Sequence, residues 1–338
     1  MNTLHRAVRI LAPALTLLAL PLASQSADLQ LPREGWVSWQ VPAVDGAPEW
    51  CCFSSWRNGE GTATACKLDG GTGGYGIHGN DRKTDTVRVY ARLAGGKVNS
   101  LQVFAASCPV QSNTPIQELA NVTADDSARW LVAQAKQSGN DAVAKRPIAE
   151  SALTALAMHR GDVARDALAG FTHDSRAETR KRAVFWLAMV RGNEGADLVS
   201  PVMFNDPDPE VRKDAAFALS QSKSARVPAD LIRLGNTDKS GDVRGQAWFG
   251  LALSEAPEAE AAIAAALKKD SDDDVREQAV FALSQLPDER ATRALIKVAE
   301  DQSLAREQRK KAVFWLSQSD SNSAQAYLEK VLAPAAAN

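Results

Sequence analysis

The 338-residue chain lacks an excess of charge of either sign. It has 39 lysine and arginine residues against 41 aspartate and glutamate residues, and a formal net charge of −2 at pH 7. Nucleic-acid-binding domains carry a basic patch and a high isoelectric point. The balance therefore argues against a nucleic-acid partner.

Histidine is scarce as well, with four residues in the chain. His78, His159 and His173, which follow the N-terminal apolar run, stand alone in the sequence. There is no H-E-x-x-H sequence of a zinc protease and no G-x-S-x-G sequence of an α/β-hydrolase. We therefore predict no catalytic residues, no metal site and no cofactor, and interpret the chain as a protein that is not an enzyme.

Long apolar runs are lacking except near the N-terminus. Arg6 and Arg9 precede the run Ile10–Ala23, and small polar residues follow it up to Ala27. This order is typical of a secretory signal peptide, and the run is too short to span a bilayer. We assign residues 1–26 to the signal peptide and expect a periplasmic or secreted mature chain without a transmembrane segment.

Cysteine is confined to four residues before position 110, Cys51, Cys52, Cys66 and Cys108. An exported chain favours disulfides, and the gaps of 13 and 41 residues do not match the two close pairs of a four-cysteine zinc site. Strands at 49–54 and 62–68, joined by a glycine-containing turn, place Cys51 opposite Cys66. Neighbouring side chains of a strand face opposite ways, which leaves Cys52 for Cys108. We expect these two disulfides.

Residues 28–114 indicate a small β module. Apolar and polar residues alternate at 36–41 and at 86–93, as in half-buried strands. A module of roughly eighty residues has a thin core, which disulfides support. It holds four of the eight tryptophans, Trp36, Trp39, Trp50 and Trp56. We expect them to fill the core; the alternative is a platform that binds a carbohydrate or a peptide.

The second half of the chain repeats itself. Arginines recur at steps of 32, 32, 32 and 33 residues, at Arg180, Arg212, Arg244, Arg276 and Arg309. Alanine, phenylalanine and leucine recur three, five and seven residues after each arginine. A fixed period of this size is typical of a solenoid, because one helical unit cannot bury its own apolar face.

Each copy indicates two helices and a polar turn. In the copy at 270–286, Val275, Ala279, Leu283 and Leu286 form one stripe of a 3.6-residue helix. A shorter helix precedes it and ends at Asp270. We assign residues 115–338 to this solenoid, with a divergent first repeat and a C-terminal capping helix, so that the fold is an all-α superhelical solenoid behind a small, mainly β domain.

The repeat resembles a known family. An aspartate six residues before a Val-Arg or similar pair, followed by Ala-(Ala/Val)-x-Ala-Leu, resembles the HEAT repeat, and the short period is similar to the subclass named after phycobilisome lyases. The resemblance covers about 140–333. Armadillo repeats are the nearest alternative, but they need a third helix.

The resemblance implies a structural role for the repeated aspartates and arginines, which form a ladder between neighbouring turns in that family. The ladder residues are Asp174, Arg180, Asp206, Arg212, Asp238, Arg244, Asp270, Arg276, Asp301 and Arg309. In the last copy the aspartate precedes the arginine by eight residues instead of six, so that two residues were added to that turn.

The phenylalanines stand on the other side of the second helix. At 100° per residue, Phe281 falls 150° from the centre of the buried stripe. The phenylalanines therefore either stack on the next copy or line the concave surface of the solenoid. In the second case the candidate partner-binding residues are Phe185, Phe217, Trp248, Phe249, Phe281 and Phe314, edged by the positive charges of Lys181, Lys213 and Lys310.

The sequence thus favours an exported binding or adaptor protein whose solenoid contacts a protein or peptide. The resemblance also implies an alternative, an enzyme of the chromophore-lyase type, although those enzymes act on cytosolic pigment proteins. A second alternative is a carbohydrate- or peptide-binding envelope protein that acts through the β module.

Overall fold

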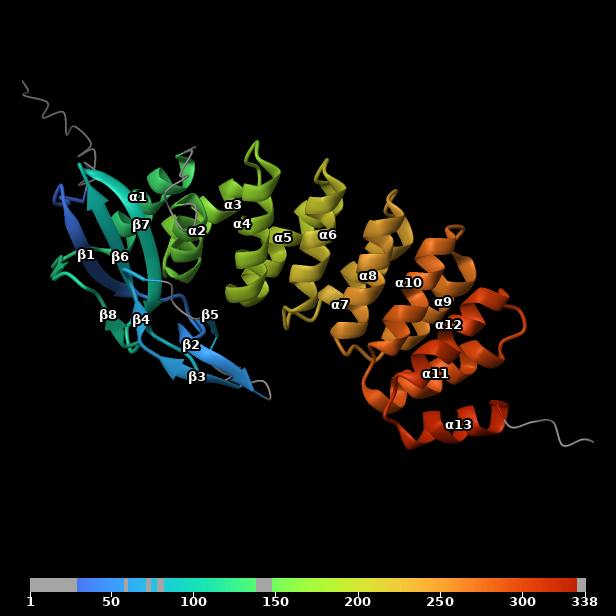
Figure 1. Ribbon diagram of the computed structural model, residues 1–338. Helices are drawn as coiled ribbons and strands as arrows, with labels where there is room; N and C mark the ends of the chain where they lie inside the picture. Colours follow the sequence, from blue (N-terminus) through green and yellow to red (C-terminus); the bar gives the residue numbers. More distant parts are fainter. Residues whose placement is uncertain (1–28, 58–59, 71–73, 78–81, 138–147, 333–338) are drawn as a thin grey trace, which may run out of the picture.

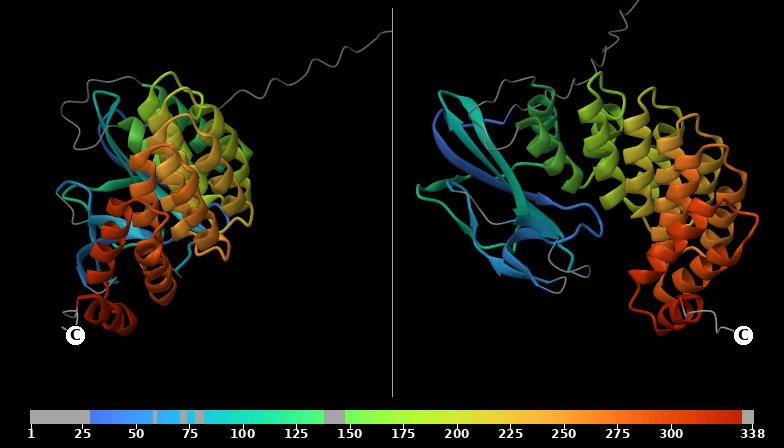
Figure 2. Two further views of the ribbon diagram at one scale, coloured as in Figure 1. Left: turned by 90° about the vertical axis from the view of Figure 1, so that its right-hand side faces the viewer. Right: turned by 45° about the vertical axis from the view of Figure 1, so that its right-hand side comes forward.

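A computed structural model describes residues 29–57, 60–70, 74–77, 82–137 and 148–332 (Figure 1). The predicted signal peptide and His78 lie outside the described residues. Within them, strands come first and helices follow, and the repeats extend in an arc away from the β module (Figures 1 and 2). The predicted fold class, a helical solenoid behind a small β region, is confirmed.

The described residues of the β module form three sheets. Its strands are β1 (Gly35–Pro42), β2 (Trp50–Arg57), β3 (Glu60–Thr64), β4 (Cys66–Lys67), β5 (Gly74–Ile77), β6 (Thr86–Ala94), β7 (Lys97–Ala105), β8 (Val110–Gln111) and β9 (Ile116–Glu118). The sheet orders are β7-β6-β1-β9, β3-β2-β5 and β4-β8. β9 runs parallel to β1, so the largest sheet includes residues beyond 114.

The largest sheet is buried on both faces. In β1, Val37 and Trp39 belong to the core that continues into the helices, whereas Trp36 faces a second core formed with Tyr90 and the cysteines. Alternate residues of a strand face opposite sides of its sheet. One face of this sheet is therefore available to seat the helical part of the chain.

The disulfides pair differently from the expectation. The structure joins Cys51 to Cys108 and Cys52 to Cys66. The cause is a register shift between β2 and β3. Near the turn Trp56 pairs with Gly61, and this register, if continued, would put Cys51 opposite Cys66. After the shift Cys52 pairs with Thr64 instead. A one-residue slip moves every side chain to the other face of a strand. The predicted pairs Cys51–Cys66 and Cys52–Cys108 are wrong for this reason.

The helical part is an ordered stack of helix pairs. Its helices are α1 (Ala124–Lys136), α2 (Ile148–Met158), α3 (Asp162–Phe171), α4 (Ala177–Val190), α5 (Gly192–Asn205), α6 (Pro209–Ser220), α7 (Val227–Thr237), α8 (Gly241–Leu253), α9 (Ala259–Lys269), α10 (Asp273–Ser284), α11 (Asp288–Glu300), α12 (Arg306–Ser317) and α13 (Asn322–Leu332). Asp208 and Asp272 accept hydrogen bonds from the first turns of α6 and α10, which fixes where these helices begin.

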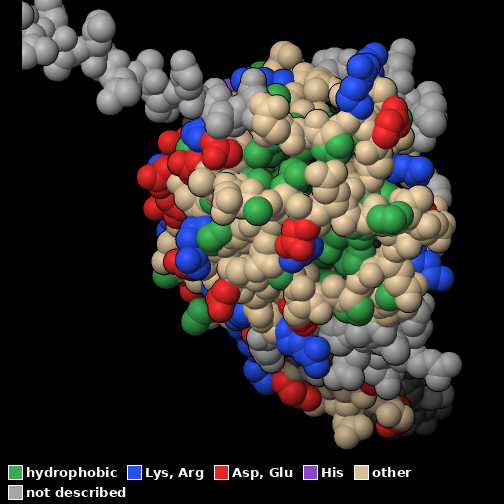
Figure 3. All heavy atoms as spheres, turned by 90° about the vertical axis from the view of Figure 1, so that its left-hand side faces the viewer, with side chains coloured by type: hydrophobic (Ala, Val, Ile, Leu, Met, Phe, Trp, Pro, Cys, Tyr) green, Lys and Arg blue, Asp and Glu red, His purple; other side chains and the backbone are tan. Residues whose placement is uncertain are grey.

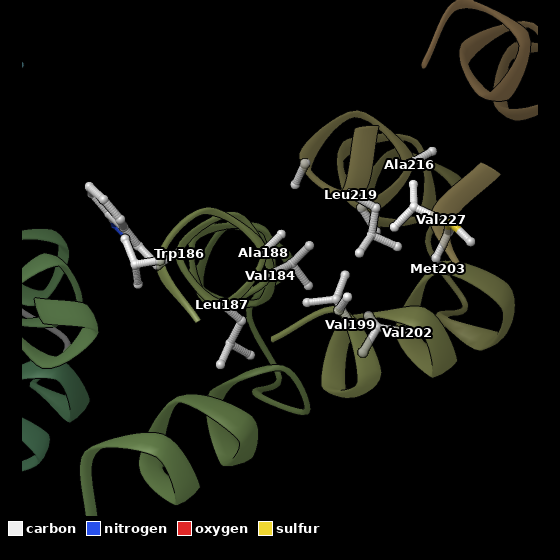
Figure 4. Close-up of a cluster of buried hydrophobic side chains, with 14 of the residues drawn as sticks. Val184, Trp186, Leu187, Ala188, Val199, Val202, Met203, Ala216, Leu219 and Val227 are labelled. Carbon is white, nitrogen blue, oxygen red and sulfur yellow. The ribbon is translucent and has the colours of Figure 1, made fainter. Parts of the chain in front are cut away.

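The repeated alanine and leucine positions form a continuous core between helix pairs. Val184 and Leu187 of α4, Val199 of α5 and Leu219 of α6 are fully buried together (Figure 4). Trp186 lies on the opposite side of α4 from Val184 (Figure 4) and contacts Trp50 of the β module. No unit is separated from its neighbour by a polar layer, since one core cluster runs from β1 to α13.

The two layers of helices pack unequally. The second helices of the pairs (α4, α6, α8, α10 and α12) contact one another extensively, whereas the first helices (α3, α5, α7, α9 and α11) contact one another little. The layer with the closer spacing lies on the inner side of a curved stack. The second helices therefore form the concave face of the arc seen in Figure 2.

Arginine–aspartate pairs join successive units. Arg212 donates from Nε and Nη2 to the carboxylate of Asp238 in the next unit, at 2.7 and 2.9 Å, and from Nη1 to the carbonyl of Asp206 in its own turn. The pairs Arg180–Asp206 and Arg244–Asp270 repeat this geometry. Each such guanidinium therefore fixes one turn and holds the next one.

The pairing ends at the last full unit. Arg276 bonds to the carbonyl of Asp270 and to Asp273, and Asp301 pairs with Lys268 instead. Arg309 donates to the carbonyl of Leu304. At the other end, the carboxylate of Asp174 pairs with Arg176. The two added residues before Arg309 displace Asp301 from the position that Asp270 occupies one unit earlier.

We expect peptide mapping without reduction to recover Cys51 linked to Cys108 and Cys52 linked to Cys66. The register of β2 against β3 brings Cys52, and not Cys51, to the side of Cys66. Because Cys51 and Cys52 are adjacent, the mapping requires cleavage between them by partial acid hydrolysis or fragmentation in the mass spectrometer. A Cys51–Cys66 fragment would refute the register shift.

Replacing Asp238 with alanine is expected to lower the free energy of unfolding by about 3–5 kcal/mol, because it leaves a buried guanidinium unpaired. The side chain of Arg212 is 3% exposed and that of Asp238 is 5% exposed. Burial raises the pKa of Asp238, but the hydrogen bonds from Arg212 and the Ser240 amide lower it further, below its ordinary value. Urea denaturation measures the loss.

The matched control is Asp301→Ala. Asp301 ends α11 as Asp238 ends α7, but its partner Lys268 is 55% exposed. Exposed ion pairs contribute little to stability. A loss as large for Asp301→Ala as for Asp238→Ala would contradict the role of burial in the ladder.

Candidate partner-binding surface

The recurring phenylalanines all lie on the second helices, and their exposure differs. Phe217 of α6 is 40% exposed and Phe314 of α12 is 51% exposed. With Val331 they are the exposed large hydrophobic residues of the described chain. Phe185, Phe249 and Phe281 are half-buried. We call the five phenylalanines, with Trp186 and Trp315, the aromatic row.

Neighbouring rings cover the half-buried members. Phe249 and Phe281 stack with centroids 5.5 Å apart and planes 5° from parallel. Phe281 also contacts Trp315, at 5.1 Å. Rings therefore stack between units from α8 to α12, whereas Phe217 and Phe314 remain open.

The row begins at the β module. Trp50 of β2 meets Trp186 edge-on with ring centroids 5.5 Å apart, and Trp186 contacts Phe185 in the same way. In α2, Thr154 stands where the phenylalanine recurs, and it borders a small hollow of about 40 Å³ beside Trp50. The concave face and the β module therefore meet through a contact between aromatic side chains.

Trp248 does not belong to this surface. It is 1% exposed, and a methyl group added to Gly235 of α7 would lie 2.5 Å from its ring. The residue one position before the phenylalanine points between the layers of helices, where the missing side chain of Gly235 makes room for an indole. The expectation that Trp248 lies beside the strip is wrong.

The lysines do not give the row a positive edge. Lys181 pairs with Glu178 and reaches Asp214, Lys213 pairs with Glu210, and Lys310 pairs with Glu307. Hydrogen bonding to Glu178 raises the pKa of Lys181, whereas burial raises the pKa of Asp214. The positive charges beside the row are therefore paired with carboxylates of this chain.

The β module offers a different surface. On its outward side, hydrophobic side chains are visible in the upper and central part of the face, around a charged pair, and other charged side chains lie toward the edges (Figure 3). Trp36 and Trp39 are buried in the two cores, and the side chain of Trp56 lies outside the described residues. The buried pair has no free ring face for a carbohydrate.

One pair of residues has the geometry of a nucleophile and a base. Ser127 Oγ of α1 lies 2.7 Å from Nε2 of His159, 32 residues along the chain. His159 Nδ1 donates to the Ala155 carbonyl, which leaves Nε2 to accept from Ser127, and Trp39 Nε1 donates to Ser127 Oγ at 2.7 Å. Both Ser127 and His159 are 0% exposed. A substrate has no access, so this chain of hydrogen bonds joins β1, α1 and α2 instead.

The sequence signal for this pair was weak, because serine and histidine are distant in the chain and no motif marks them. His173 lies on the exposed turn after α3. Among the described residues no group of three or more histidine, cysteine, aspartate or glutamate side chains has the geometry to hold a metal ion. None of the described helices is long and apolar enough to cross a membrane.

Protonation of His159 in acid should weaken the junction, by which we mean the packing of β1, α1 and α2 around the hydrogen bonds of Trp39, Ser127 and His159. Burial, together with the charge of Arg191, lowers its pKa to about 4. Between the folded pKa and the unfolded value of about 6.5, the unfolded chain binds more protons. The contribution of neutral His159 to the free energy of unfolding is therefore fully present above about pH 6.5. About 3 kcal/mol of it is lost as pH falls toward 4.

The measurement is the free energy of unfolding between pH 4 and 7 for the wild type, for His159→Gln and for the control His173→Gln. His159→Gln keeps an acceptor for Ser127 but does not titrate, so it should flatten the dependence on pH. The wild-type slope should persist in His173→Gln. Equal slopes in all three proteins would show that folding does not lower the pKa of His159.

Comparison with known proteins identifies the repeat. The family model described as HEAT repeats matches residues 164–252 and 236–313. The comparison with curated proteins gives no match.

Solved structures similar to this chain include human deoxyhypusine hydroxylase (18% identity, 64% of this chain and 81% of that one, TM-score 0.34). The CpcE–CpcF complex of phycocyanin lyase from a Nostoc species is another (13% identity, 56% and 81%, TM-score 0.28). YibA of Escherichia coli is a third (18% identity, 62% and 79%, TM-score 0.38).

The matched residues cover the units from α3 to α12, and the arginine–aspartate pairs lie within them. Residues 164–313 of this protein, from α3 into α12, are therefore HEAT repeats, and a small β region with two disulfides precedes them.

Proposed function

We propose that this protein is an exported, non-enzymatic adaptor that binds an apolar segment of a partner protein along the concave face of its HEAT repeats. The observation that carries the proposal is the exposure of Phe217 and Phe314 at equivalent positions of α6 and α12. Large exposed apolar side chains are a usual mark of an interaction surface. Their recurrence along one face indicates an elongated partner.

The spacing of the repeats limits the shape of that partner. Packed helices lie about 8–10 Å apart. An α-helix rises about 10 Å in seven residues, and an extended chain covers about 10 Å in three. A partner segment with apolar side chains at either interval would meet one phenylalanine per unit. Because the lysines beside the row are paired, the segment needs no acidic residues.

The disulfides support the location. Two disulfides among the described residues fit an oxidising compartment outside the cytoplasm. The signal-like N-terminus agrees with this placement. We therefore expect the partner in the periplasm or outside the cell.

The test is photo-crosslinking from position 217 in the cell envelope of the source organism, followed by affinity measurements with the purified partner. We expect Phe217→Ser/Phe314→Ser to weaken binding about thirtyfold, since each ring buries only its exposed half on binding. The free energy of unfolding should change little, because both rings are already open to solvent.

Val331→Ser is the matched control, since Val331 is 50% exposed on α13 but lies off the row. It should leave the affinity unchanged. Equal binding by the double variant, or crosslinking from position 331 to the same partner, would overturn the proposal.

A further inference from the structure

Two HEAT-repeat helices begin at one hollow beside the β module. The hollow has a volume of about 420 Å³ and is bounded by the loop after β1 and by the first turns of α3 and α5. It shares no residue with the aromatic row. Its occupant would therefore contact other residues than the partner proposed above.

Both helices start with an arginine–glycine pair. Arg160-Gly161 precedes α3, and Arg191-Gly192 stands 31 residues later at the start of α5. Gly161 and Gly192 have φ angles of +107° and +51°. No side chain caps either helix. The first amide groups of a helix have no partner within it, so two sets of donors remain at this hollow.

Arg191 is the second feature of the hollow. It is 8% exposed, it forms no ion pair within the described chain, and only Nη2 has an acceptor, the carbonyl of His159 at 2.8 Å. Nε is buried without a partner. Burial lowers the pKa of the Arg191 guanidinium. Glu194, Asp162 and Asp166 act on Arg191 through their charges without forming an ion pair with it. A buried cation without a directly bonded counterion is costly, which makes this group receptive to an anion.

The other two arginines are already neutralised. Arg160 pairs with Asp45 at 2.6 Å, and Arg165 pairs with Asp162 and Glu194 at 2.8 and 3.2 Å. Three arginines and three carboxylates therefore line the hollow, and their formal charges cancel. Of the three arginines that line the hollow, Arg191 is the one without a carboxylate partner among the described residues.

We propose that this hollow binds a carboxylate group, held by Arg191 and by the first amides of α5. A carboxylate carries a single negative charge at neutral pH, whereas a phosphate monoester carries about 1.5 to 2. In a lining without net charge, the single charge is accommodated with less repulsion from Asp45, Asp162 and Glu194. The hollow, at about 420 Å³, is larger than a carboxylate, so it has room for part of the molecule that carries the group.

Titration calorimetry at pH 7 and fixed ionic strength tests the proposal. The probes are acetate, inorganic phosphate, and an N-acetylated alanine tripeptide with a free or an amidated C-terminus. We expect acetate and the free-acid peptide to bind, and the amidated peptide and phosphate not to bind. Tighter binding of the free-acid peptide than of acetate identifies a chain end as the source, and equal binding identifies a free small acid.

Two substitutions should move the affinity in opposite directions. Arg191→Gln should weaken acetate binding about tenfold, by removing a charge-assisted hydrogen bond. Glu194→Gln should tighten it about threefold, because one repelling carboxylate is lost. Glu194 is on the surface, so its effect remains readable if Arg191→Gln folds poorly.

Arg226→Gln is the matched control. Arg226 precedes α7 as Arg191 precedes α5, but Asp197 and Asp230 already neutralise it. It should bind acetate like the wild type. The proposal is overturned if the wild type binds neither acetate nor the free-acid peptide, if phosphate binds more tightly than acetate, or if Arg191→Gln binds like the wild type.

Discussion

The stack depends on the buried pairing of one repeat's arginine with the next repeat's aspartate. Arg212 holds the turn of its own unit through a carbonyl and the turn of the next through the carboxylate of Asp238. The planar guanidinium fork allows both contacts in one geometry. The pairs therefore set the angle between units as well as their spacing, and a missing partner would leave a buried charge. They also hold the second helices at regular intervals, which aligns the aromatic row.

The start of the stack is held differently. There the hydrogen-bonded chain of Trp39, Ser127 and His159 connects β1 with α1 and α2, and the carbonyl of His159 accepts from Arg191 of the next unit. The β module thus replaces a preceding repeat, and the core is continuous across the junction. Arg191 belongs to both the junction and the proposed carboxylate site, so the two are mechanically connected.

Identical residues in equivalent places acquire different roles from their neighbours. Phe281 is covered because Phe249 precedes it and Trp315 follows it. Phe314 stands in the last second helix, and it is 51% exposed among the described residues. Phe217 is open within the stack. A docking surface on this face would be uneven, with open rings separated by a stacked pair. The same units that give stability where rings stack give exposed apolar area where they do not.

The sequence determined the period, the helix pairs and the aspartate–arginine spacing, because short-range periodicity and turn residues are local properties of the chain. It also limited the disulfides to the β module. The tertiary structure decided the rest. A register shift near Trp56 and Gly61 exchanged the cysteine partners. The missing side chain of Gly235 leaves the space in which the ring of Trp248 is buried. The hydrogen bond between Ser127 and His159 forms only because α1 packs on α2. Each outcome depends on contacts between distant segments, which the order of residues alone does not specify.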